Sequence, residues 1–127
     1  DSFRDWGHAK DYVEMQWLML QQKKPDDYVI ATGLQYSVRD FISLVAKELK
    51  IDIFWKNKGL KEHALDKNGK KIILVDKRYF RPSEVNDLMG DSSKARKNLG
   101  LRPKISLKKM IKEMVDHDLK KARLKKK

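Results

Sequence analysis

The strand-forming segments of this chain are few and short, and this limits the available folds more than any other feature. β-Branched and aromatic residues predict strands at residues 28–33, 51–56 and 71–76. The polar residues 57–70 predict a loop with a turn at Asn68-Gly69. So few strands cannot form a doubly wound sheet of about five or more. We therefore expect a mixed α/β unit that is part of something larger.

Apolar residues at helical spacing predict helices at residues 8–22, 36–50, 92–100 and 106–122. The helix at 8–22 carries a wide apolar side, which indicates burial on more than one face. Ser37 and Asp40 form a near capping box at the start of the second helix. Gly100 should end the third helix, and Ser106 should cap the fourth. The residues of the last helix expected to face inward are Leu107, Met110, Ile111, Met114 and Val115.

The length and composition indicate one small domain with a real core. The chain has 127 residues, of which 40% are hydrophobic, and no cysteine, so it has no disulfides and no thiolate zinc site. The three histidines lie in different segments without metal-ligand spacing. No apolar run approaches the roughly 18 to 20 residues that span a bilayer, and no signal peptide is recognisable. We expect a cytoplasmic protein that does not contact a membrane.

The net charge of +12 has two interpretations. One is nucleic-acid binding through phosphate neutralisation, and the other is solvation of surface helices by lysine. Residues 120–127 supply six of the positive charges and are expected to form a basic solvated tail. No aromatic RNA-binding motif, helix-turn-helix pattern or zinc finger accompanies the charge. We therefore expect no nucleic-acid partner, and a stand-alone basic module for nucleic acid or regulation is the alternative interpretation.

A self-contained active site is not recognisable in this sequence. None of the six glycines belongs to a Gly-x-Gly-x-x-Gly motif or a phosphate-binding loop. No Tyr-x-x-x-Lys pair occurs, because the residues four positions after the tyrosines are Gln16, Thr32, Asp40 and Ser83. We expect no catalytic residue, no cofactor-binding residue and no metal ligand in these residues.

What the sequence does offer is a set of candidate anion ligands. They are Arg4, Arg39 and Arg81, with Glu84 close to the last. The planar fork of arginine suits two phosphate oxygens at once, and a carboxylate can accept from both hydroxyls of a ribose. Pro82 favours extended backbone at Arg81, so this side chain can project from the edge of a loop.

Each candidate also has a simpler interpretation as a member of a surface ion pair. Arg4 is followed by Asp5, and Arg39 is followed by Asp40. Exposed pairs of this kind contribute little to stability and need no ligand. Taken one residue at a time, the pattern alone favours the ion pair.

Three segments together resemble a known family. They are RDWGHAKDYVEMQWLMLQ, YVIATGLQYSVRDF, and the stretch that begins YFRPSEVNDLMGDSSKARKNLG. In this order they resemble the C-terminal part of the GDP-mannose 4,6-dehydratases, which belong to the extended short-chain dehydrogenase/reductase superfamily. The resemblance covers about residues 3–119 and fades in the loop at 56–71 and in the lysine tail.

The resemblance implies a fold and an activity. Such enzymes have an N-terminal Rossmann domain that holds NADP and a smaller C-terminal part that holds the GDP-sugar. They are lyases that convert GDP-mannose to GDP-4-keto-6-deoxymannose and water. Residues 1–119 would then be the GDP-sugar-binding portion, with mostly helices, a few short strands and no Rossmann core. This portion alone would be inactive, and a related sugar-nucleotide dehydratase or epimerase is the nearest alternative.

The resemblance also implies roles for individual residues. Arg4 and Arg81 match arginines expected at the diphosphate of the substrate, and Glu84 matches a glutamate expected at the ribose. Arg39 matches an arginine expected near the substrate, near the cofactor or at a subunit interface. Without the Rossmann half, apolar surface should stay uncovered, especially on the helix at 8–22, and such surface favours self-association. We therefore expect a homo-oligomer.

Overall fold

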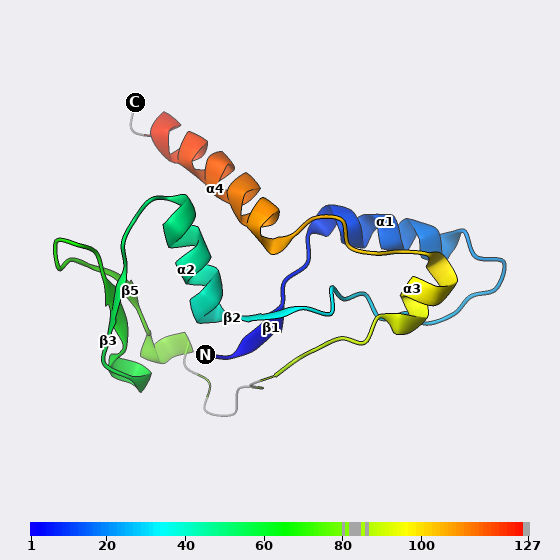
Figure 1. The fold of residues 1–127 in the computed structure, drawn as a ribbon, viewed down its shortest axis with the longest axis horizontal. Helices are drawn as coiled ribbons and strands as arrows, with labels where there is room; N and C mark the ends of the chain where they lie inside the picture. Colours follow the sequence, from blue (N-terminus) through cyan, green and yellow to red (C-terminus); the bar gives the residue numbers. More distant parts are fainter. Residues whose placement is uncertain (80, 82–84, 86, 126–127) are drawn as a thin grey trace.

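The computed structural model describes residues 1–79, 81, 85 and 87–125, and it shows helices and short strands that alternate along the chain (Figure 1). The helices are α1 (Ala9–Leu20), α2 (Val38–Glu48), α3 (Ser93–Leu99) and α4 (Leu107–Leu124). The strands are β1 (Phe3–Asp5), β2 (Gln35–Ser37), β3 (Phe54–Lys56), β4 (His63–Leu65) and β5 (Lys71–Leu74). Two 3-10 helices, η1 (Gly59–Lys61) and η2 (Lys77–Tyr79), flank the last two strands. The expected mixed α/β class is confirmed.

The strands form two separate antiparallel sheets. β1 pairs with β2, which places Arg4 opposite Tyr36, and β3, β4 and β5 form a second sheet in that order. β1 and β2 were not predicted, because strands of three residues carry too little alternation to be recognised. The segment predicted as a polar loop contains β4, although its expected turn is present: the amide of Asp66 donates to the carbonyl of Lys70, and Gly69 has a φ of 77°.

The strand predicted at residues 28–33 is wrong. This segment is an irregular connection between α1 and β2, although Ala31 within it is buried. The amides of Thr32 and Gly33 donate to the carboxylate of Asp5 instead of to a neighbouring strand. Gly33 also has a φ of 75°, which turns the chain out of an extended path. The apolar run in this segment therefore reflects burial of a loop.

The main core lies between α2 and α4. Its buried residues come from α4 and are Leu107, Met110, Ile111 and Val115. Trp6 and Phe41 pack against them, with their ring centroids 4.6 Å apart. Four of the five inward-facing residues expected on this helix are thus buried, whereas Met114 is 49% exposed. The last turns of α4 extend beyond α2 (Figure 1).

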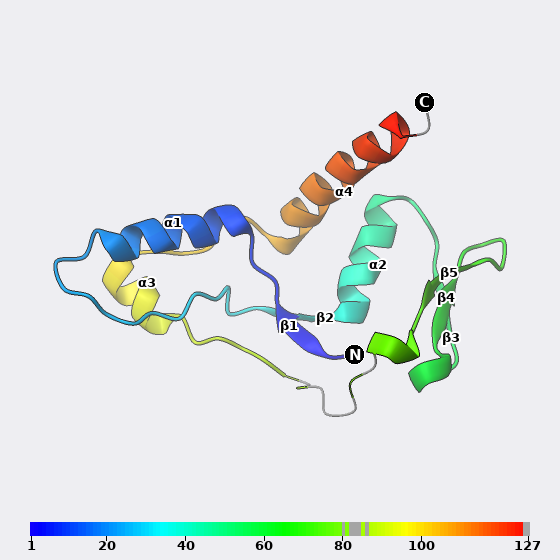
Figure 2. The same cartoon turned by 180° about the vertical axis from the view of Figure 1, so that it is seen from behind.

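A second contact region lies at the other end of the molecule, where α1 and α3 run side by side (Figure 2). Met15 and Ala95 are buried there. The expectation of uncovered apolar surface on α1 is confirmed, since Val13 is 61% exposed, Trp17 58% and Leu20 82%. Burial of α1 on more than one face is not found among the described residues. The sequence pattern of α1 therefore encodes an apolar face that nothing in the described residues covers.

Local capping signals decide where the other helices begin. Ser37 accepts from the amide of Asp40, and the Asp40 carboxylate accepts from the Ser37 amide, which completes the predicted capping box of α2. The Asp40 carboxylate also accepts from the Ser37 hydroxyl at 2.7 Å, and this hydrogen bond, followed by the one from the Ser37 amide, lowers the pKa of Asp40. Ser106 caps α4 as expected, and Gly100 ends α3 with a φ of 67°.

Candidate anion-binding site

The first motif, residues 4–12, uses most of its polar side chains to hold backbone in place. The Asp5 carboxylate accepts from the Thr32 amide at 3.0 Å, the Thr32 hydroxyl at 2.6 Å and the Gly33 amide at 2.8 Å. The His8 Nδ1 atom accepts from the Lys10 amide and caps α1. Asp5 and His8 therefore hold the backbone around β1 in place, which is a structural role and not a ligand contact.

Tight packing around Tyr12 explains the glycine in the same motif. A Cβ atom at Gly7 would overlap the Tyr12 ring, so only glycine fits between β1 and α1. Burial, followed by the nearby carboxylates of Asp5 and Asp11, raises the pKa of the Tyr12 phenol. Tyr12 is thus a neutral ring that packs against Gly7 in the connection between β1 and α1.

Asp11 is a buried carboxylate that sequence analysis did not single out. Its side chain is 4% exposed, and its Oδ2 atom accepts from the amides of Lys104 at 3.1 Å and Ile105 at 3.0 Å. These two hydrogen bonds connect α1 to the segment that leads into α4. The sequence did carry one signal for this role, because Asp11 is an acidic residue on the buried side of a predicted amphipathic helix.

Arg4 lies where β1 meets the loop that follows η2. Its Nη1 atom donates to the carbonyl of Val85 at 2.9 Å and to the carbonyl of Phe3 at 2.6 Å. Gln35, opposite Asp5 in the sheet, donates to the carboxylate of Asp87 in the same loop. Val85 and Asp87 are therefore held against β1 and β2, close to Arg4.

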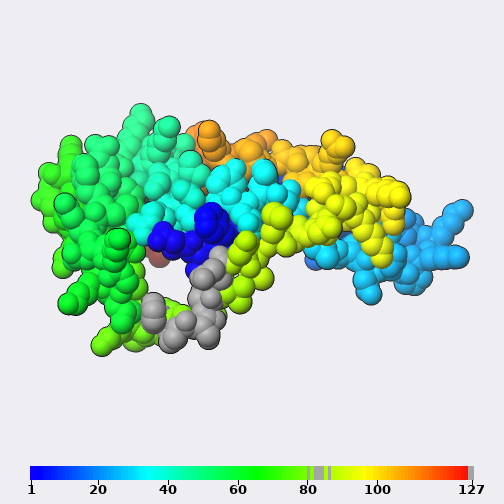
Figure 3. All heavy atoms as spheres, turned by 60° about the horizontal axis from the view of Figure 1, so that its bottom comes forward, coloured from blue at the N-terminus to red at the C-terminus, as the bar shows by residue number. Residues whose placement is uncertain are grey.

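Arg81 lines a groove of about 430 Å³ beside the N-terminal strand. One wall is formed by Asp1, Ser2 and Val38, and Tyr79 and Arg81 belong to the other wall. Figure 3 shows the hollow between the dark-blue N-terminal residues and the green segment. Arg81 is exposed and forms no hydrogen bond or ion pair with any residue that the structure describes. Its guanidinium is thus available to a ligand in this groove.

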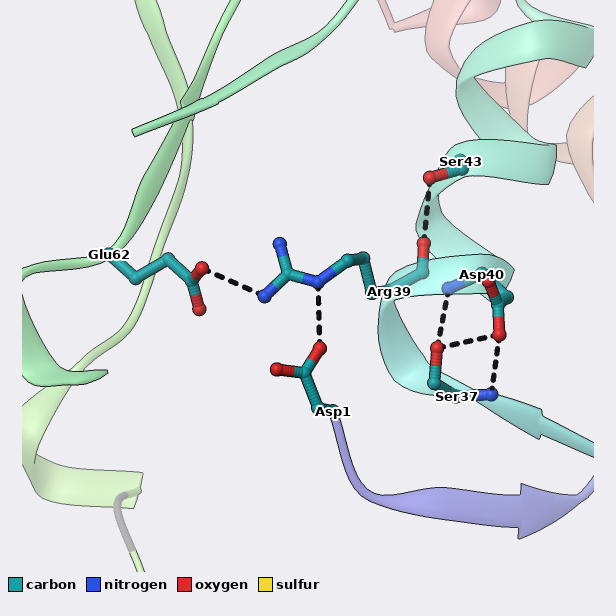
Figure 4. A network of polar contacts seen from close by, with 6 residues as sticks. All are labelled: Asp1, Ser37, Arg39, Asp40, Ser43 and Glu62. Carbon is teal, nitrogen blue, oxygen red and sulfur yellow. Dashed lines mark hydrogen bonds and ion pairs between the residues drawn. The ribbon is translucent and has the colours of Figure 1, made fainter. Parts of the chain in front are cut away.

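Arg39 lies beside the same groove but makes several contacts within the chain (Figure 4). Its Nε atom donates to Asp1 at 2.7 Å, and its Nη2 atom donates to Glu62 at 2.8 Å. Its guanidinium carbon lies 4.3 Å from the centroid of the Trp55 ring. The structure therefore brings Arg39 close to the wall that faces Arg81, while Glu84 lies outside the described residues.

Two other kinds of site are not found among the described residues. These residues contain no group of histidine, aspartate and glutamate side chains that could hold a metal ion. No helix among them is long and apolar enough to cross a membrane. Of the candidate arginines, Arg81 lines the groove itself, and Arg39 reaches it through its hydrogen bond to Asp1.

Comparison with known proteins identifies relatives along nearly the whole chain. A family model described as GDP-mannose 4,6 dehydratase matches residues 1–114. A protein named GDP-mannose 4,6-dehydratase from Vibrio cholerae serotype O1 is 52% identical over 96% of this chain and 36% of its own length. Proteins with that name from Caenorhabditis elegans and Arabidopsis thaliana are 47% and 48% identical over 93% and 91% of the chain. The chain spans about a third of the length of these relatives, 31% and 28% of the latter two.

Proposed function

Because this chain belongs to the GDP-mannose 4,6-dehydratase family, we propose that it is the GDP-sugar-binding portion of such an enzyme. In the whole enzyme, a lyase, GDP-mannose would lose water to give GDP-4-keto-6-deoxymannose. The chain by itself would bind the nucleotide and carry out no reaction. The observation that carries this proposal is the exposed guanidinium of Arg81, which pairs with no described residue, on the wall of a groove beside the strand of Arg4.

The chemistry of the groove fits a nucleoside diphosphate. A guanidinium fork can donate to two oxygens of a diphosphate, and such charge-assisted hydrogen bonds are roughly twice as strong as neutral ones. In our proposal Arg81 contacts the diphosphate, and Arg4, hydrogen-bonded to the Val85 carbonyl, supplies the second cation. Glu84 at the ribose stays a prediction, because it lies outside the described residues.

The described residues do not fit a dinucleotide such as NADP. Dinucleotide folds place the pyrophosphate at the start of a helix that follows a glycine-rich turn. The caps of the longer helices here are His8, Ser37 and Ser106, whose side chains accept from the first-turn amides. NADP, which the whole enzyme would use, would therefore be bound by residues outside this chain.

Calorimetric titration of the chain with GDP tests the proposal. We expect saturable binding that Arg81→Ala weakens at least roughly tenfold, the size expected for one charge-assisted hydrogen-bonded contact. The matched control is Arg102→Ala, since Arg102 is also an exposed arginine that precedes a proline, but it lies between α3 and α4. Equal loss of affinity in both variants would contradict a specific diphosphate contact.

The same titration separates the proposal from a general affinity for polyanions. Single-stranded and duplex nucleic acid are added at two salt concentrations in place of GDP. A basic module would bind them with an affinity that falls steeply with salt and does not depend on Arg81. That result, without saturable GDP binding, would replace the proposed function by the basic-module alternative.

The uncovered apolar face of α1 leads to a prediction about assembly. Val13, Trp17 and Leu20 are exposed on that helix, and contiguous apolar patches favour association. We expect the chain to self-associate at micromolar concentrations, measurable by analytical ultracentrifugation, and Trp17→Ser to shift the equilibrium towards monomer. A monodisperse monomer whose sharp melt does not depend on concentration would oppose a homo-oligomer built on this face.

A further inference from the structure

Arg39 lies at the meeting point of three parts of the chain that are distant in sequence. It starts in the first turn of α2, and its guanidinium reaches Asp1 before β1 and Glu62 between η1 and β4 (Figure 4). The Trp55 ring of β3 covers one face of the guanidinium. Figure 4 shows the side chain extended between the helix and the sheet, with the two carboxylates on different sides.

These contacts leave Arg39 poorly suited to bind a phosphate directly. Two of its nitrogen atoms already donate to carboxylates, and the Trp55 ring lies over one face of the planar guanidinium. The positive charge of the guanidinium is already balanced by the carboxylates of Asp1 and Glu62, which leaves less attraction for an anion. The side chains of Arg39 and Glu62 are only 28% and 19% exposed, so their interaction is less screened by solvent than that of a surface pair.

The same contacts connect the two walls of the groove that contains Arg81. On one wall, the Val38 amide donates to the Ser2 carbonyl at 3.1 Å, next to Arg39 itself. On the other wall, the Val75 amide donates to the carbonyl of Glu62 at 3.2 Å, and the chain continues from Val75 through η2 to Arg81. The Arg39–Glu62 ion pair therefore connects α2, at one wall, with the segment after β5 that leads to Arg81 at the other.

We propose that Arg39 is a positioning residue that holds the two walls of this groove together, so that Arg81 faces a bound nucleoside diphosphate. The inference rests on the proposed function of Arg81, and it assigns Arg39 no contact with the ligand. A planar, always charged fork is needed for this arrangement, because lysine can neither reach two carboxylates in fixed directions nor stack flat on a tryptophan. Glu62 and Trp55 should then matter for ligand affinity in the same way as Arg39.

A double-mutant cycle on GDP affinity tests the proposal. Arg39→Lys and Glu62→Gln are each expected to weaken GDP binding roughly five- to tenfold in the otherwise unchanged chain, within the usual range of couplings between neighbours. Neither change should weaken binding further when Arg81→Ala is already present. The reason is that the Arg39–Glu62 ion pair, which we call the tether, affects the ligand only through Arg81. Full additivity of Arg39→Lys and Arg81→Ala would show that Arg39 contacts the ligand itself and would overturn the proposal.

A second measurement needs no ligand and separates this inference from the proposed function. In NMR spectra of the ligand-free chain, Arg39→Lys and Glu62→Gln should shift the amide signals of Val75 and Tyr79 alike. Arg123→Lys, a matched change at the exposed end of α4, should leave these signals in place. Unmoved Val75 and Tyr79 signals would refute the tether even if GDP binds as proposed. Shifted signals without any GDP binding would retain the tether and reject the proposed function.

Discussion

Residues 4–12 and residues 77–81 both belong to motifs rich in charged and aromatic side chains, yet they use them differently. In the first segment, Asp5, His8 and Asp11 each accept hydrogen bonds from backbone amides. In the second, Tyr79 is 77% exposed, and Arg81 is exposed on the wall of a groove. Similar residue types thus hold the fold in one segment and remain accessible to a ligand in the other. Substitutions in the first should change stability, and those in the second should change affinity.

The largest expected effect comes from the buried carboxylate of the first segment. Asp11→Ala removes the acceptor of the Lys104 and Ile105 amides, and we expect a loss of about 3 kcal/mol in the free energy of unfolding because hydrogen bonds to a charged group are lost. Urea denaturation followed by circular dichroism measures it. Asp118→Ala, an exposed aspartate on α4, is the control and should change stability little. Equal stability of the two variants would remove the contrast between the segments.

A smaller loss of stability is expected at the glycine of the same segment. Gly7→Ala places a methyl group against the Tyr12 ring, and we expect about 2 kcal/mol of destabilisation from overpacking. The comparison variant is Gly69→Asn, because nothing lies near a Cβ there and asparagine tolerates a positive φ. Denaturation midpoints should separate the two variants clearly. If Gly7→Ala were as stable as the parent chain, the packing of Tyr12 against β1 would be wrong.

The smallest effect is expected at the exposed ion pair that precedes Arg81. Hydrogen bonds from Arg78 lower the pKa of Asp76, so the pair contributes to stability above the ordinary pKa of 3.8 and loses that contribution as the pH falls through the lowered value. Arg78→Ala should therefore raise the pKa of Asp76 towards 3.8. Carbon-13 NMR of the Asp76 carboxyl during an acid titration measures this. The midpoint of urea unfolding near neutral pH should hardly change, because the pair is exposed.

Local signals explain the parts of the fold that the sequence predicted correctly. The capping box of Ser37 and Asp40 needs only four consecutive residues, and α2 begins where this pattern places it. The turn at Asn68-Gly69 and the end of α3 at Gly100 are local in the same sense. The strand at 28–33 was predicted wrongly because the competing interaction comes from Asp5, which precedes Gly33 by 28 residues.

The candidate site was predictable only in part, for the same physical reason. Arg81 could be singled out because a proline follows it and a glutamate lies three residues further on. The ion pairs of Arg39 could not, since its partners Asp1 and Glu62 are 38 and 23 residues away, and the neighbouring Asp40 instead completes the cap of α2. Sequence spacing indicates which residue types are present, whereas only the folded chain shows which of them already have a partner.

The exposure of Trp17 makes it an intrinsic optical reporter. Trp6 is packed against Phe41, and Trp55 lies under the guanidinium of Arg39, whereas the Trp17 indole is more than half in water. Iodide in solution should therefore quench Trp17 fluorescence first, and its emission should lie furthest to the red. Any surface that covers α1 will move that emission to the blue and shield it from iodide, without a label and without disturbing the groove of Arg81.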